Sequence, residues 1–189
     1  MIGGNSASFI QEFDTFNPYY GPGVPISSTT AICIAYYNIT LDEPGRVMVN
    51  DKAMQVMGYT QIDKNATLTV QAQYNWHGAG VAVSPSLPAP YFPSRPSIAW
   101  IRELGAENST QAVNGISIPG PVYGRFVRES NPNVSDNVIL SDCGAGILQV
   151  TYRTKIRATE DSSIGVLPVD PQPGEELWRF ITSLDVYKC

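Results

Sequence analysis

A strict alternation of apolar and polar residues runs from Thr67 to Trp76, and it limits what this chain can fold into more than any other feature. Its apolar side holds Leu68, Val70, Ala72, Tyr74 and Trp76, and its polar side holds Thr67, Thr69, Gln71, Gln73 and Asn75. Because successive side chains of a strand point to opposite faces, a period of two predicts a β-strand with one buried face. A second segment, 147–157, alternates in the same way, with Leu148, Val150, Tyr152 and Ile156 on its apolar side. We expect the apolar side of the first segment to be buried against that of the second or its equivalents.

Further strands are predicted along the chain, separated by turn sequences such as Glu43-Pro44-Gly45, Asp63-Lys64-Asn65 and Pro119-Gly120-Pro121. Thr30–Leu41 is apolar on both faces, which predicts a central strand. Shorter candidates are 47–49, 80–83, 116–118, 123–127 and 138–140, with a last strand around Trp178, Phe180, Leu184 and Val186. Only 51–57 and 97–104 have a spacing compatible with a short helix, and the second also fits a strand. The predicted fold is all-β, a two-sheet antiparallel β-sandwich of jelly-roll type with under about a tenth of its residues in α-helix.

The length of 189 residues suits one core, so a single domain spanning 1–189 is expected. Charged residues make up 15% of the chain, below the usual ~25%, so Ser, Thr, Asn and Gln must form much of the surface. The net charge is −5 and basic residues form no run, which argues against nucleic-acid binding. No stretch approaches the ~18 apolar residues of a membrane span, so membrane insertion is not expected.

Residues that carry chemistry are sparse. His77 is the only histidine, and no two cysteines have metal-ligand spacing. Ile139–Ala145 resembles the apolar-Asp-Thr-Gly-Ala turn of retroviral-type aspartic proteases, but Cys143 takes the Thr place, and a simple turn between strands is the preferred interpretation. We therefore expect no catalytic residue, no metal and no cofactor; a secreted hydrolase on a β-scaffold is the enzymatic alternative.

Three cysteines and four glycosylation sequons bear on the compartment. Cys33 lies in an apolar run and is predicted to be a buried thiol, whereas a bridge involving Cys143 or Cys189 is left open. The sequons begin at Asn38, Asn65, Asn108 and Asn133, and they favour an extracellular or virion-surface location over chance occurrence only weakly.

Basic residues gather on one predicted strand. Arg153, Lys155 and Arg157 should project from one face about 7 Å apart, and with Arg125 and Arg128 they form five of the 12 basic residues. One interpretation is a binding stripe for an anionic glycan. The other is a solvated face that also discourages edge-to-edge aggregation.

A proline-rich segment, 84–97, is predicted to be a long stiff loop, because proline removes ladder donors and favours extended backbone. Exposed aromatics on rigid loops suit sugar stacking and protein interfaces. The candidate partner- or glycan-binding residues are Tyr19, Tyr20, Tyr91, Phe92 and Arg95. We expect contact through these loops rather than through the sheet faces; the alternative is that the aromatics fold back to plug the ends of the sandwich.

The segment Gly146–Ile156 resembles the last jelly-roll strand of small icosahedral RNA-virus coat proteins, which often have the pattern Gly-x-Leu-x-Val-x-Tyr. Such proteins usually carry a basic N-terminal arm, whereas the first basic residue here is Arg46. The resemblance implies a protruding or accessory outer capsid domain that associates with copies of itself and meets a host glycan or receptor. A lectin-like or adhesin module is the alternative from a different functional class.

Overall fold

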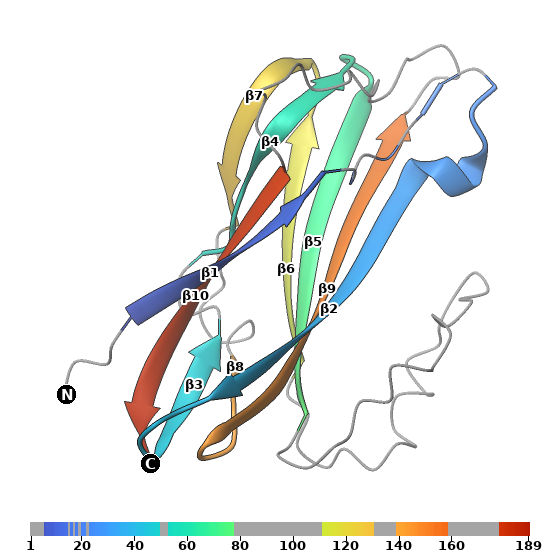
Figure 1. The fold of residues 1–189 in the computed structure, drawn as a ribbon. Helices are drawn as coiled ribbons and strands as arrows, with labels where there is room; N and C mark the ends of the chain where they lie inside the picture. The colour runs from blue at the N-terminus through green and yellow to red at the C-terminus, as the bar shows by residue number, and fades with distance from the viewer. Residues whose placement is uncertain are drawn as a thin grey trace.

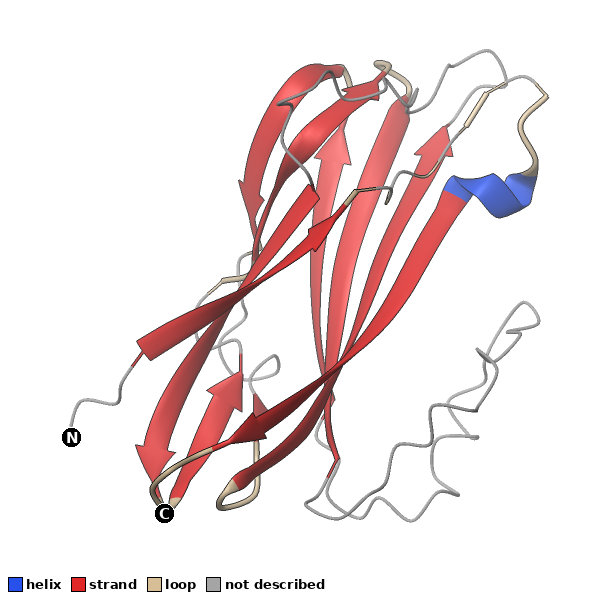
Figure 2. Cartoon of the chain, in the orientation of Figure 1, coloured by secondary structure: helices blue, strands red, loops and turns tan. Residues whose placement is uncertain are grey.

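The computed structural model describes residues 6–14, 16, 18, 20–21, 23–49, 53–77, 111–130, 139–158 and 178–189. The strands in this part of the chain are β1 (Ser6–Phe13), β2 (Thr30–Thr40), β3 (Gly45–Val49), β4 (Gln55–Ile62), β5 (Ala66–His77), β6 (Gln111–Pro119), β7 (Val122–Glu129), β8 (Ile139–Leu140), β9 (Ala145–Ala158) and β10 (Trp178–Lys188). The described ranges contain one helical element, the single 3₁₀ turn η1 (Ile26–Thr29), and no α-helix (Figure 2). None of their helices is long and apolar enough to span a membrane.

The strands form two antiparallel sheets that lie one over the other (Figure 1). The four-stranded sheet has the order β2-β9-β5-β6. The six-stranded sheet has the order β7-β4-β10-β3-β8, with β1 also paired to β10. The predicted fold class, a two-sheet antiparallel sandwich, is therefore confirmed.

The pairing follows one simple rule. β1 pairs with β10, β2 with β9, β3 with β8, β4 with β7 and β5 with β6. These pairs are nested, as in one long hairpin whose two arms have been rolled up together. Rolling such a ribbon into two facing sheets is what makes a jelly roll. As a result, residues far apart in the chain are neighbours throughout the molecule.

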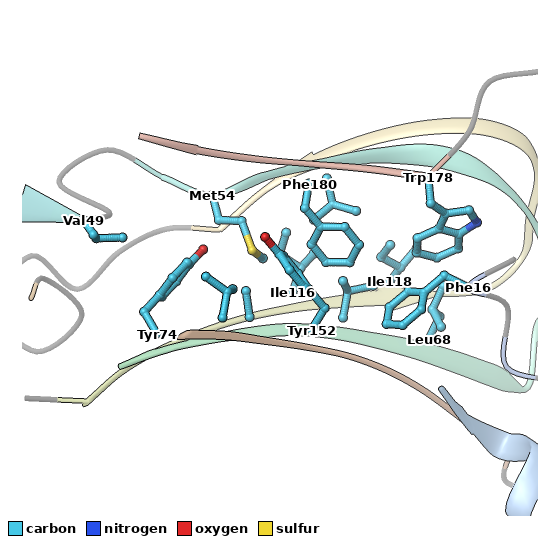
Figure 3. Packing of buried hydrophobic residues seen from close by; sticks show 14 of the residues in the cluster. Phe16, Val49, Met54, Leu68, Tyr74, Ile116, Ile118, Tyr152, Trp178 and Phe180 are labelled. Carbon is cyan, nitrogen blue, oxygen red and sulfur yellow. The ribbon is translucent and has the colours of Figure 1, made fainter. Parts of the chain in front are cut away.

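The core lies between the two sheets (Figure 3). The predicted apolar sides of β5 and β9 are buried, and Leu68, Val70, Tyr74, Leu148 and Val150 are each 0% exposed. These two strands are neighbours in one sheet, where Tyr74 lies opposite Val150. The layer that covers them comes from the other sheet, with Met54, Trp178 and Phe180 facing across the gap (Figure 3).

Two predicted elements are corrected by the structure. Thr30–Leu41 was expected to be a central strand, but β2 lies at one end of its sheet and pairs only with β9 among the described strands. Its apolar outer side is exposed rather than covered, with Ile32 51% and Tyr36 49% exposed.

The short helix that the spacing of 51–57 allowed is not formed, because residues 55–62 form β4. The inward positions of β4 include Gly58 and Thr60, and these small or polar residues hide the alternation in the sequence. Gly58 packs closely against Trp178, since a Cβ there would lie 3.2 Å from Cγ of the indole. The strand β1 was not predicted at all. The predicted strand at 80–83 and the ambiguous segment 97–104 lie outside the described residues.

The sequence left the cysteine pairing open, and the structure joins Cys143 to Cys189, so the β8–β9 turn is bonded to the residue after β10. The same turn contains Asp142, which is exposed and whose carbonyl accepts a hydrogen bond from the amide of Ala145 (3.2 Å). This confirms the predicted turn between strands. Cys33 is a free thiol on the edge strand and is half-buried, not buried as predicted; its partial burial raises the pKa of the thiol.

Candidate functional site

The outer side of the four-stranded sheet is a broad surface made largely of amide and hydroxyl groups. We call it the polar face and define it by the outward residues of its four strands. They are Thr30, Ile32, Ile34, Tyr36 and Asn38 on β2; Ile147, Gln149, Thr151, Arg153, Lys155 and Arg157 on β9; Thr67, Thr69, Gln71, Gln73, Asn75 and His77 on β5; and Val113, Gly115 and Ser117 on β6. No Asp or Glu is among these residues, although the whole chain has a net charge of −5.

The three cations of the polar face form a row along β9. Arg153 lies between Ile32 of β2 and Gln71 of β5, and Lys155 lies between Thr30 and Thr69. Because β9 is an inner strand, the row cannot protect a sheet edge, so that part of the solvated-face interpretation is wrong. Arg125 and Arg128 lie on β7 in the other sheet, so the five basic residues do not form one site.

His77 lies at the end of β5 on the polar face. Its Nε2 donates a hydrogen bond to Oε1 of Gln149 on β9 (2.8 Å). This fits the expected hydrogen-bonded histidine at a strand end. Among the described residues, no group of three or more His, Cys, Asp or Glu side chains could hold a metal ion.

The β2 side of the polar face was not predicted as a site. Ile32, Ile34 and Tyr36 form an apolar row there, and two of them are about half exposed. A signal was present in the sequence, since the eleven residues of β2 include no charged residue and no proline. The same apolar character was interpreted as evidence for a central strand.

Of the five residues proposed for partner binding, only Tyr20 is described. It is half-buried and packs against the core, as expected if aromatics plug the end of the sandwich. Tyr19, Tyr91, Phe92 and Arg95 lie outside the described residues.

The chain segments that bear these residues leave the sandwich at opposite ends. The segment before β2 joins the end where Thr30 and Thr69 both lie beside Lys155. The segment 78–110 is anchored by His77 and Gln111, at the far end of β5 and β6. At roughly 3.3 Å per residue, the twelve residues of β5 separate these ends by about 36 Å. The described residues to which these two segments attach therefore lie at opposite ends of the sheet.

No protein-family model matches the chain, and no curated protein is similar to it in sequence. Among solved structures, a chain of mud crab tombus-like virus is similar in fold, with 10% sequence identity and a TM-score of 0.30 over 99% of this chain and 90% of that one. VP1 of Trichodysplasia spinulosa-associated polyomavirus, solved in complex with 6'-sialyllactose, is similar with 11% identity and a TM-score of 0.35 over 97% of this chain and 96% of that one. The same VP1 in complex with GM1 oligosaccharide gives 9% identity and a TM-score of 0.33 over 100% of this chain and 95% of that one. The segment Gly146–Ile156, which resembles the last jelly-roll strand of small RNA-virus coat proteins, lies in β9, and a further strand, β10, follows it.

Proposed function

We propose that this chain is a non-enzymatic structural protein of a virus particle, an outer capsid domain that associates with copies of itself and contacts the host surface. The observation that carries the proposal is a jelly-roll sandwich whose broad outer face is neutral apart from three cations. Jelly rolls build viral capsids and lectins. The proposal therefore rests on fold and surface rather than on a catalytic site.

The polar face carries few charges for its size, and this favours packing between copies. Few charges have to lose their water when two such faces meet, and a charge buried without a partner is costly. The disulfide between Cys143 and Cys189 adds a second argument, because such bonds persist in oxidising surroundings, including virion and cell surfaces. A virion-surface or extracellular location follows from the proposal.

Self-association is tested by multi-angle light scattering on the purified full-length chain over a range of salt and protein concentrations, with electron microscopy of the same samples. We expect defined oligomers or particles. A chain that remains monomeric under all these conditions would contradict the capsid proposal.

Host contact is proposed to involve the loop residues Tyr19, Tyr20, Tyr91, Phe92 and Arg95. A loop stiffened by proline loses little entropy when it binds, and its aromatic pair offers a large apolar area on few rotatable bonds. Replacing Tyr91 and Phe92 together by Ser should abolish binding to target cells while the melting temperature stays near that of the parent. Unchanged binding by the folded double variant would remove these loops from the proposal.

A lectin-like module is the second candidate function, and one observation favours it. Arg153, Lys155 and Arg157 lie on a face without carboxylates, beside the amides of Gln71 and Gln73. Guanidinium groups pair with carboxylates or sulfates, and amides can bind sugar hydroxyls. A glycan array with neutral, sialylated and sulfated glycans distinguishes the two candidates. Binding of acidic glycans that disappears in Arg153→Gln would favour the lectin.

A further inference from the structure

The exposed edge of the four-stranded sheet is the surface from which we draw a further inference. β2 pairs with β9 on one side, and no described strand pairs with its other side (Figure 1). In an antiparallel ladder, alternate residues direct their backbone N–H and C=O groups away from the neighbouring strand. Along this edge, alternate residues of β2 therefore have backbone donors and acceptors that no described strand pairs.

β2 lacks the features that usually protect such an edge. Exposed edge strands tend to be short, or to carry charged residues, proline or bulges, because an unprotected edge pairs with other chains. At the opposite edge of the same sheet, β6 also has no charged residue, although it ends in Pro119. The open strands of the other sheet are better protected. β7 carries Arg125, Arg128 and Glu129, and β8 is two residues long. β2 has the sequence TAICIAYYNIT and contains none of these features.

The outer side chains of β2 are also of the kind that a partner covers. Ile32 and Tyr36 are 51% and 49% exposed, and Ile34 lies between them. These side chains form an apolar row beside the unpaired backbone. A partner strand would thus gain both ladder hydrogen bonds and apolar contact.

We propose that β2 pairs antiparallel with β2 of a second copy of this chain across a two-fold axis at Ile34, which joins the two four-stranded sheets into one. This inference rests on the proposed function, since it names the surface used for self-association. A two-fold axis brings each surface against its own equivalent. A strand without charges meets itself without repulsion, whereas β7 would place its arginines close to their own copies.

The register centred on Ile34 is self-complementary. It places Ile32 opposite the second copy's Tyr36, and Ile34 opposite its own copy, so six apolar side chains form one cluster. Thr30 falls opposite Asn38 and Cys33 opposite Ala35, so no charge is placed in the pairing. Since Arg153 lies beside Ile32 and Gln149 lies beside Tyr36, each Arg153 is in the same row as Gln149 of the second copy. The two arginines are thereby kept apart.

The first test is sedimentation velocity on the full-length chain and on Ile34→Lys, which would bring two ammonium groups together at the axis. We expect the parent to contain dimers or larger species and Ile34→Lys to lose them. Val113→Lys is the matched control, because Val113 is an exposed apolar residue on β6 of the same sheet. This variant should associate like the parent. Circular dichroism melting confirms that each variant is folded.

A second test does not require the folded chain to tolerate a lysine at position 34. In a Cys33→Ser background, Ile34→Cys should form a disulfide-linked dimer under mild oxidation, because the two new thiols face each other at the axis. Val113→Cys in the same background should remain uncrosslinked.

The outcomes separate this inference from the capsid proposal. If the parent assembles while Ile34→Lys assembles equally and Ile34→Cys does not crosslink, the β2 interface is wrong and the capsid proposal stands. If Ile34→Cys crosslinks into dimers but no particles form under any condition, the interface stands and the capsid proposal fails. A parent chain that stays monomeric overturns both. A β2 edge that binds only a strand from a different protein overturns the β2 interface alone.

Discussion

Buried tyrosine hydroxyls tie strands together inside the sandwich. The hydroxyl of Tyr37 donates to Oε1 of Gln11 (2.6 Å) and lies 3.2 Å from that of Tyr152, so Tyr152 is the donor of that pair. The hydroxyls of Tyr74 and Thr182 are 2.9 Å apart and link β5 to β10 across the core. Burial raises the pKa of both Tyr74 and Tyr152 well above the usual value of 10.0. The folded chain thus holds these phenols in the neutral form.

These raised pKa values predict the alkaline limit of stability. Each of these phenols has a higher pKa in the folded chain than in the unfolded chain, so its contribution to stability is fully present below pH 10.0. The contribution is lost as the pH rises above that value, because the unfolded chain then ionises first. The free energy of unfolding, measured by urea titration, should therefore fall above about pH 10. The free energy of unfolding of Tyr152→Phe should fall less steeply with pH. At neutral pH it should be lower than that of the parent by about 1 kcal/mol, because a hydrogen bond is lost. The control Tyr36→Phe alters a ring on the outer face. If the free energy of unfolding of Tyr152→Phe falls with pH as steeply as that of the parent, the raised pKa of Tyr152 is not the cause of the alkaline loss of stability.

Val150 offers a direct test of which side of β9 is buried. Val150→Asp would place an unpaired carboxylate in the core, where Val150 is 0% exposed. We expect it to lower the free energy of unfolding by about 4 kcal/mol or to prevent folding. Thr151→Asp, one residue along on the polar face, should change it by less than about 1 kcal/mol. Similar melting temperatures for the two variants would show that the faces are reversed.

Among the strands, those with one polar and one apolar side could be predicted from the sequence. Strands without this contrast could not. β5 and β9 alternate cleanly because one side of each is in water. β2 was mistaken for a central strand because an apolar exposed side and an apolar covered side look alike in sequence. β4 was missed because Gly58 and Thr60 occupy inward positions.

The candidate site was predictable only strand by strand. Alternation shows that Arg153 and Lys155 share a face. It cannot show that Gln71 and Ile32 lie beside Arg153, because pairing between distant strands leaves no local signal. The nested order of the strands could not be predicted for the same reason, because it too depends on pairing between distant strands.

The Cys143–Cys189 bridge should stabilise the β8–β9 turn and the end of β10. It spans a sequence separation of 46 residues, and removing a bridge of this kind typically costs about 3 kcal/mol. We expect a reducing agent to lower the melting temperature of the parent and of Cys33→Ser alike. The double variant Cys143→Ser, Cys189→Ser should already melt lower and should not respond to reduction. A parent insensitive to reduction would show that the bridge contributes little.

In the molecule as a whole, β10 is the strand on which the six-stranded sheet depends. It pairs with β1, β3 and β4 and contributes Trp178 and Phe180 to the core. A chain ending at residue 177 should therefore lose its cooperative melting transition, measured by circular dichroism. Adding a synthetic peptide of residues 178–188 should restore part of it. A truncated chain that still melts cooperatively would show that the other sheet folds on its own.

The nested pairing also sets the order of events during synthesis. A ribosome releases the chain from β1 onward, yet β1 must wait for β10, and β2 for β9, before either finds its ladder. The β2 strand emerges early and remains unpaired with β9 until most of the protein has been translated. Nascent chains on neighbouring ribosomes could meet through it in that interval. We therefore expect the protein to depend on chaperone binding, or on slow dilute expression, far more than a helical protein of equal length.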